Sequence, residues 1–317
     1  MQISSCNITI DSNNNFIDID NKKNVNLLVQ QYSLAKYGSI KDIKFLANMI
    51  TKKLFQEIDN PQSKFRNILE IAKQDNDYIV LMTPGFRNVK ASANLMFDFV
   101  LPYINTKLAI MGFPIVAELK LPRLATPCEN YASLSAEERK IIGLTTDHIL
   151  PDLDFYKNNN IHVIYGDDIL ITGSSSNKAK NDALSKGAKS FTSIFAMIVD
   201  KEVALNNPSI EEQINKSKVT EELDSTAKEI FIQKDFIPVL RSLRLFLNIK
   251  NLSNLKYFIN EIPIHNILKI YIAYVTNESL DNDKYLQSLK IIQEYLISQN
   301  KIMPCGNLLV GVENESI

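Results

Sequence analysis

Tryptophan is absent from this 317-residue sequence, and cysteine is scarce. Cys6, Cys128 and Cys305 lie far apart and form no C-x-x-C pair. The sequence therefore predicts neither a zinc site nor a disulfide framework, and a reducing compartment fits. Neither sign of charge predominates, because the sequence has 35 Lys and Arg residues and 36 Asp and Glu residues. This balance, with no helix-turn-helix signal, argues against a nucleic-acid partner.

Long hydrophobic runs are missing as well. The longest, such as residues 94–104, are too short and too interrupted to span a bilayer. The first fifteen residues lack the basic and apolar regions of a signal peptide. We therefore expect a cytoplasmic protein with no membrane partner. The histidines, His148, His162 and His265, show no metal-ligand spacing, which favours structural or surface roles.

The spacing of apolar residues predicts three parts. Residues 1–60 combine short alternating runs, which fit small strands or a loose arm, with helical spacing broken at Tyr37-Gly38. Residues 61–205 alternate short apolar runs with helical stretches, which predicts an α/β fold with a doubly wound parallel sheet. In this part we expect strands at 78–82, 107–112, 115–119, 161–165 and 193–199, a helix ending near Tyr103 and another at 175–187. Residues 206–317 lose the strand period after Pro208 and predict a C-terminal all-helical subdomain.

One segment carries a chemical pattern. The apolar run 161–165 leads into Gly166 and two adjacent acids, and three further apolar residues precede a small-residue loop that opens a predicted helix. Such a loop offers a phosphate backbone N–H groups and the positive end of the helix dipole. Carboxylates accept hydrogen bonds strongly and a ribose offers hydroxyl donors, so the combination indicates a sugar phosphate. Neither a G-K-[ST] loop nor G-x-G-x-x-G is present. The alternative interpretation is a strand end with solvated acids and a serine-rich loop.

The run Val163-Ile164-Tyr165-Gly166-Asp167-Asp168-Ile169-Leu170-Ile171-Thr172-Gly173-Ser174-Ser175 resembles the phosphoribosyl-pyrophosphate motif of type I phosphoribosyltransferases. The resemblance covers about residues 75–200. Within it, the arrangement Tyr131…Leu134-Ser135-Ala136-Glu137-Glu138-Arg139, which precedes the two acids, also resembles an uncharacterised bacterial branch of that family. It implies that Asp167 and Asp168 hold the 2- and 3-hydroxyls of ribose. It also implies that the 5-phosphate is held by Thr172, Gly173, Ser174, Ser175 and Ser176.

Two residues depart from the family pattern. Gly166 is unusual in a strand and indicates a bulge or a close approach. Ile171 stands where some purine-specific members carry an acid that acts as general base. Because isoleucine moves no proton, we do not expect a 6-oxopurine acceptor handled in that way.

A second segment is similar to the family's pyrophosphate loop. The run 78–82 is followed by Thr83-Pro84-Gly85-Phe86-Arg87-Asn88, and the resemblance gives Arg87 a catalytic role beside Asp167 and Asp168. The residues expected to bind substrate here are Gly85, Asn88, Lys120 and Arg123. A loop near residues 125–147 would close over the reacting centre, with Tyr131, Ser133, Arg139 and Lys140 able to reach phosphate. A plain strand-to-helix turn and a solvated loop are the alternatives.

The resemblance implies a Mg²⁺-dependent enzyme that transfers a 5-phosphoribosyl group from phosphoribosyl pyrophosphate to a nitrogen acceptor and releases pyrophosphate. The Mg²⁺ is expected through the substrate, near Asp167 and Asp168, with no direct protein ligands. Residues 1–60 or the helical subdomain could form a hood over the acceptor, and a homodimer is an open expectation. Two alternatives remain: a non-catalytic regulator that senses phosphoribosyl pyrophosphate on the same fold, and an α/β scaffold whose helical part docks a partner.

Overall fold

The computed structural model describes residues 1–123, 151–277 and 283–309. It divides into two compact units, which are described separately. The α/β unit comprises Met1–Val29, Ile43–Arg87 and Ser92–Ile214. The helical unit comprises Gln30–Asp42, Asn88–Ala91 and the chain from Asn215 onward. No helix within the described ranges has the length and apolar character needed to cross a membrane.

A seven-stranded sheet with the order β3-β2-β1-β7-β6-β4-β5 forms the centre of the α/β unit. Strands β1, β7, β6, β4 and β5 are mutually parallel, and β2 and β3 add antiparallel pairs at one edge. Their bounds are β1 Gln2–Ile10, β2 Phe16–Asp18, β3 Lys23–Asn24, β4 Tyr78–Met82, β5 Val116–Leu119, β6 Ile161–Leu170 and β7 Ser190–Val199. The central strands are buried almost throughout, as expected of parallel strands covered on both faces.

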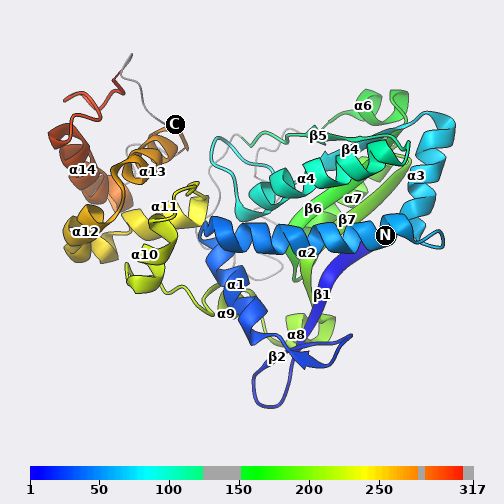
Figure 1. Ribbon diagram of the computed structural model, residues 1–317, viewed down its shortest axis with the longest axis horizontal. Helices are drawn as coiled ribbons and strands as arrows, with labels where there is room; N and C mark the ends of the chain where they lie inside the picture. The colour runs from blue at the N-terminus through cyan, green and yellow to red at the C-terminus, as the bar shows by residue number, and fades with distance from the viewer. Residues whose placement is uncertain (124–150, 278–282, 310–317) are drawn as a thin grey trace. The chain divides into compact units, whose positions relative to one another are not determined.

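Helices cover both faces of this sheet. On one face, Val163 and Tyr165 of β6 share a core with Tyr156 of α6 and Ala183 of α7. On the other face α4 packs against β5 and β6, and Figure 1 shows it in cyan on the near side of the green strands. The helices that belong wholly or mainly to this unit are α2 Ile40–Asp59, α3 Lys64–Asp75, α4 Ser92–Ile110, α6 Leu153–Asn158, α7 Ser174–Ser185, α8 Lys201–Asn206 and α9 Ile210–Asn215. Helix α1, Asn26–Lys36, lies mainly in the helical unit. The doubly wound α/β fold is thus confirmed.

The predicted strand at residues 107–112 is wrong, because α4 continues to Ile110. Pro102 lies inside this helix, although proline removes a backbone donor. Val100, Ile104 and Leu108 are nevertheless buried at a constant spacing of four, so one apolar stripe faces the sheet on both sides of the proline. Burial of that stripe keeps the chain helical.

Strand β6 is longer than predicted, and the residues before α1 form strands instead of a loose arm. β6 runs from Ile161 to Leu170, so the two acids lie inside the strand rather than after it. β1 enters the sheet between β2 and β7, with Ile3 opposite Ile194 and Ile8 opposite Val199. The local apolar runs of the sequence therefore indicated a shorter β6 and did not indicate that β1 joins the sheet beside β7.

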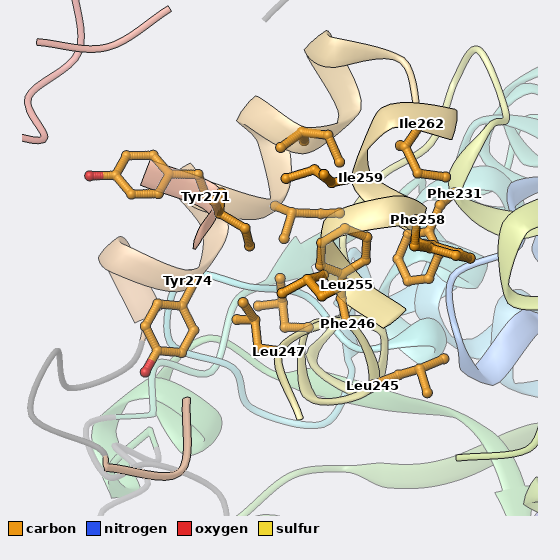
Figure 2. Packing of buried hydrophobic residues seen from close by; sticks show 14 of the residues in the cluster. Phe231, Leu245, Phe246, Leu247, Leu255, Phe258, Ile259, Ile262, Tyr271 and Tyr274 are labelled. Atoms are coloured by element: carbon orange, nitrogen blue, oxygen red, sulfur yellow. The ribbon is translucent and has the colours of Figure 1, made fainter. Parts of the chain in front are cut away.

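The helical unit is confirmed as all-helical in its main elements. It contains α10 Ser225–Phe231, α11 Leu240–Leu247, η2 Ile249–Asn251, α12 Leu252–Phe258, η3 Ile259–Glu261, α13 Ile264–Asn277 and α14 Asp283–Ser298. Its core includes Phe231, Phe246 and Phe258, which meet edge to face, with Phe231 and Phe246 ring centroids 4.9 Å apart (Figure 2). Such edge-to-face pairs stabilise beyond the burial of area alone.

Candidate functional site

The strand order reverses between β4 and β6. From β4 the chain passes to β5 at the sheet edge and then returns to β6 on the other side of β4. Open α/β sheets bind ligands outside the carboxyl ends of their strands at such a switch point. Residues 83–87 follow β4, Lys120 and Arg123 follow β5, and the acids with their serine-rich loop end β6. The topology therefore brings the two sequence motifs to one edge of the sheet.

The two acids differ in their surroundings. β6 extends past its last pairing with β4, Tyr165 opposite Met82, and continues along β7 with Asp167 opposite Phe195. Because successive strand residues point to opposite faces, Asp167 and Asp168 project in opposite directions. Asp168 is only 2% exposed, and its Oδ2 accepts a 2.8 Å hydrogen bond from the hydroxyl of Ser92 at the start of α4. Asp167 is half-buried and accepts from the Tyr165 hydroxyl at 3.4 Å and from the Asp168 N–H at 2.9 Å.

Gly166 marks a close approach, one of the two outcomes predicted for it. A Cβ at this position would lie 2.6 Å from Cε1 of Phe97, far inside ordinary van der Waals contact. The missing side chain lets the Phe97 ring of α4 rest directly on β6 beside the acids. Together with the Ser92 bond to Asp168, this contact fixes the amino-terminal half of α4 against the motif.

The loop after β6 has the form of an anion site. Gly173 adopts a left-handed φ of 73°, where glycine carries no steric penalty, and α7 begins at the next residue. The N–H of Asn177 donates to Gly173 O at 2.8 Å, so the earlier N–H groups of this first turn have no acceptor within the helix. Thr172 and Ser175 are exposed, whereas Ser176 is buried and its hydroxyl lies 3.4 Å from Gly173 O. The N–H of Ser174 donates to Thr172 Oγ1 at 3.5 Å. N–H groups at the start of a helix can bind a phosphate.

Residues 83–91, the β4–α4 loop, are held from two sides. Asn94 of α4 is 2% exposed, and its Nδ2 donates to Thr83 Oγ1 and to Pro84 O, each at 2.9 Å. Farther along, the Phe86 N–H donates to Leu121 O at 3.3 Å and the Arg123 N–H donates to Phe86 O at 3.2 Å. Sequence reasoning missed Asn94, although an amide among the apolar residues at the start of Ser92–Ile110 was a usable signal.

Phe86 links the predicted pyrophosphate loop to the two predicted cations. Lys120 Nζ lies 4.5 Å from the centre of the Phe86 ring, and Phe86 pairs with Pro122 in an isolated parallel bridge. Gly85 and Arg87 flank Phe86 in the chain, and Arg87 is exposed. The structure therefore brings Gly85 and Arg87 to the same edge of the sheet as Lys120 and Arg123.

Asn88 forms hydrogen bonds with residues of the helical unit. Its Nδ2 donates to the carbonyl oxygen of Thr276, and its N–H donates to Asn277 Oδ1 at 3.2 Å. The side chain thereby binds the end of α13, and a contact with substrate stays a prediction. Tyr131, Ser133, Arg139, Lys140, Cys128 and His148 lie outside the described residues.

His162 lies at the opposite end of β6 from the acids, in a buried polar network. Its Nε2 is 3.0 Å from Asp77 Oδ2, its Nδ1 is 2.8 Å from the Ser190 hydroxyl, and Lys189 Nζ lies 2.7 Å from Asp77 Oδ2. Burial acts to raise the pKa of Asp77, but the hydrogen bonds from Lys189 and His162 outweigh it and hold that pKa below its ordinary value. The network ties β4, β6 and β7 together at the edge away from the candidate site.

Comparisons with known proteins are sparse. No family model matches the chain, and no curated protein matches it. Three similar solved structures are all hypoxanthine phosphoribosyltransferases of Trypanosoma cruzi: one from work on the role of its C-terminal region, and two of a single-site mutant, with the product IMP and as a ternary substrates complex. Their identities are 11%, 10% and 13%, and their TM-scores 0.29, 0.27 and 0.26. The matches cover 54%, 50% and 53% of this chain and 68%, 64% and 69% of theirs. Because these TM-scores are all below 0.3, the matches carry no argument about function, and the function must follow from this chain's own residues.

Proposed function

We propose that this protein transfers a 5-phosphoribosyl group from phosphoribosyl pyrophosphate to a nitrogen acceptor and releases pyrophosphate. One observation carries the proposal: β6 delivers an acid pair and a phosphate-type loop to the carboxyl edge of the sheet, at its switch point. A carboxylate pair beside an anion site would repel a bare phosphate. It suits a ligand that has both a phosphate and neighbouring hydroxyl groups.

Each group then has a role in binding. The 5-phosphate lies on the N–H groups of the loop at Thr172, Gly173, Ser174 and Ser175, at the positive end of α7. Asp167, the more exposed of the two acids, accepts from a ribose hydroxyl. Asp168 reaches the ligand from beside Ser92 or acts by orienting the end of β6. The pyrophosphate lies along Gly85 and Arg87, where Lys120 and Arg123 add positive charge.

This arrangement suits a dissociative transfer. As the bond from ribose C1 to pyrophosphate lengthens, positive charge develops on the ring and negative charge on the leaving oxygens. The Asp167 carboxylate stabilises the positive charge on the ribose ring, and the cations near Phe86 stabilise the negative charge on the leaving pyrophosphate. Little acid–base chemistry is needed on the departing side, so positioning and electrostatics supply most of the acceleration.

The residues present also fit Mg²⁺. In such sites the ion is bound largely by substrate phosphate oxygens, so it would reach this protein through the substrate. Asp167 is the acid exposed enough to lie near it, whereas Asp168 is buried against Ser92. Within residues 1–123, 151–277 and 283–309, no group of three or more His, Cys, Asp or Glu side chains could hold a metal alone. A bound Mg²⁺ would neutralise charge on the departing pyrophosphate.

A screen for acceptor-dependent pyrophosphate release tests the proposal. The full chain is incubated with phosphoribosyl pyrophosphate, Mg²⁺ and, in separate reactions, purines, pyrimidines, nicotinate-like bases and amines. Release with one acceptor class, and its loss in the Asp167→Asn, Asp168→Asn double variant, is the expected result. Tight binding without turnover for any acceptor would instead favour a sensor of phosphoribosyl pyrophosphate. Absence of binding would contradict both.

A further inference from the structure

The amide of Asn94 fixes the direction of one peptide group in the loop after β4. Asn94 lies buried in the first turn of α4, and its Nδ2 donates to Thr83 Oγ1 and to Pro84 O, each at 2.9 Å. An amide nitrogen carries two hydrogens, so each acceptor can receive one of them. The carbonyl oxygen of Pro84 is therefore held toward Asn94.

The next N–H in the chain must then point the other way. The carbonyl of Pro84 and the N–H of Gly85 belong to one planar trans peptide group, in which these two groups point in opposite directions. Since the Pro84 oxygen faces Asn94, the Gly85 N–H faces away from it. Among residues 1–123, 151–277 and 283–309, no group accepts a hydrogen bond from this N–H.

The same turn of α4 also holds the acid pair. Ser92 stands two residues before Asn94 and donates to Asp168 at 2.8 Å. Strands β4 and β6 are adjacent, with Met82 opposite Tyr165, so the start of the loop lies beside the acid-bearing part of β6. All of these contacts lie within the α/β unit. One turn of helix therefore fixes the loop and the acids relative to each other.

We propose that Asn94 is a positioning residue for the pyrophosphate subsite: by holding Pro84 O, it aims the Gly85 N–H at the leaving pyrophosphate. The inference rests on the proposed function, in which Gly85 binds that group. A donor held in place before the ligand arrives costs no reorganisation during the reaction. Asn94 needs no contact with the ligand for this role. Because such coupling is reciprocal, pyrophosphate must in turn favour the peptide orientation that Asn94 holds.

A purely structural role makes a different prediction. If Asn94 serves only to satisfy buried polar groups beside β4, its replacement lowers stability but leaves the affinity of the folded protein for pyrophosphate unchanged. The protection of the Gly85 N–H by pyrophosphate would also be unchanged. Affinity and the protection of this one N–H must therefore be measured beside stability.

The experiment compares the full chain of natural sequence with three variants. Asn94→Ala removes both donated bonds, and Asn94→Ser takes its place if it does not fold. Thr83→Val keeps the shape of the side chain and removes only the bond to its hydroxyl, so Pro84 O stays held. Asn105→Ala is the matched control on the same helix. Its Nδ2 donates to Val116 O at 2.9 Å and its Oδ1 accepts from the Val116 N–H at 2.8 Å, at the amino end of β5 and away from the loop.

Two readouts apply to each protein: calorimetric titration with inorganic pyrophosphate and Mg²⁺, and hydrogen exchange at Gly85 with and without pyrophosphate. We expect pyrophosphate to slow exchange at Gly85 in the natural sequence. Asn94→Ala should bind pyrophosphate about tenfold more weakly, the equivalent of roughly 1.4 kcal/mol, and should lose most of this protection. Ribose 5-phosphate should bind Asn94→Ala as it binds the natural sequence, because the loop after β6 is untouched. Thr83→Val should lose less than about threefold in affinity, and Asn105→Ala should melt earlier with little change in affinity.

A folded Asn94→Ala variant that binds pyrophosphate like the natural sequence would overturn the inference. So would equal losses of affinity in Asn94→Ala and Asn105→Ala, since general loosening of α4 would then explain both. Binding of pyrophosphate to the natural sequence without protection of the Gly85 N–H would also overturn it, and would leave the proposed function standing. If the natural sequence binds neither pyrophosphate nor phosphoribosyl pyrophosphate, the proposed function fails and the inference falls with it.

Discussion

The hydroxyl of Ser92 donates a 2.8 Å hydrogen bond to Asp168, joining the first residue of α4 to the acid pair of β6. Both partners are buried, each with 2% of its surface exposed. Asp167, one residue earlier, faces the other side of the strand and is the more exposed acid. The two adjacent carboxylates of this motif therefore lie in different surroundings.

Replacing the acids should separate binding from stability. Asp167→Asn removes a charged acceptor worth about 1.5–3 kcal/mol in a hydrogen bond to a ligand hydroxyl, so affinity for phosphoribosyl pyrophosphate should fall at least about tenfold. The double variant with Asp168→Asn should bind more weakly still, and it should melt somewhat earlier, because the bond from Ser92 to the buried Asp168 is then no longer charge-assisted. Calorimetric titration with Mg²⁺ present, beside a thermal melt, measures both. Unchanged binding in a well-folded double variant would mean that the motif is a look-alike.

Ser92→Ala tests the structural side of the pair. Without this hydroxyl the buried Asp168 loses a donor, and we expect the free energy of unfolding to fall by about 1.5–3 kcal/mol. Chemical denaturation of the variant and of the natural sequence gives the difference. A loss below about 0.5 kcal/mol would show that other partners of Asp168 suffice.

The loop after β6 should hold an anion. Crystals grown in sulfate or phosphate should show the ion on the N–H groups of residues 174–176. Gly173→Ala should destabilise the protein by about 1–2 kcal/mol, because φ at this position is 73°, and should also weaken phosphate binding. Gly187→Ala is the matched control: it has a φ of 95° just past the other end of α7 and should lose stability without losing phosphate affinity. An empty loop with its N–H groups turned away would count against the assignment.

Gly166 and Phe97 should behave as one unit. Gly166→Ala forces a methyl group against the Phe97 ring and should destabilise the protein by about 1–3 kcal/mol. In the double variant with Phe97→Leu, the smaller side chain leaves room for the methyl group. Its loss of stability should therefore be less than the sum of the two single losses. Strict additivity in urea denaturation would contradict this contact.

Asp77 should stabilise the protein at neutral pH but not in strong acid. Its folded-state pKa lies below the ordinary value near 3.9, so its contribution is present above about pH 4 and is lost as the pH falls through the folded-state pKa. Asp77→Asn should cost about 1.5–3 kcal/mol at pH 7, and its difference from the natural sequence should shrink toward pH 2. Denaturation curves at several pH values measure this. Asp75→Asn, which removes a carboxylate 3.5 Å from Lys189, is the control and should cost less.

Local patterns predicted the parts of the site whose chemistry lies within a short stretch of chain. The apolar run, the acids and the small residues of the motif are contiguous, so the strand, the loop and α7 could be expected from sequence. The partners of the acids could not. Ser92 stands 76 positions before Asp168, and which acid is buried depends on which face of β6 α4 covers.

Other features depend on even more distant contacts. Asn277 and Asn88 are 189 positions apart, and neither residue signals the other in the sequence. The strand expected at residues 107–112 was also wrong for a non-local reason, because the buried stripe of α4 keeps these residues helical across Pro102. Proline is a local signal, whereas the burial of Ile104 and Leu108 is decided by the sheet.

The placement of β1 has a consequence for how the chain acquires its structure. β1 pairs with β7, so Ile3 must find Ile194, and β2 and β3 join the sheet only through β1. Contacts of such large sequence separation slow folding, because loop closure must precede the stabilising contact. While β7 is still missing, β1 and the far end of β6 remain unpaired edges that can associate with other chains. Among the strands, β7 alone pairs with the acid-bearing end of β6, so binding competence should be among the last properties to appear during refolding.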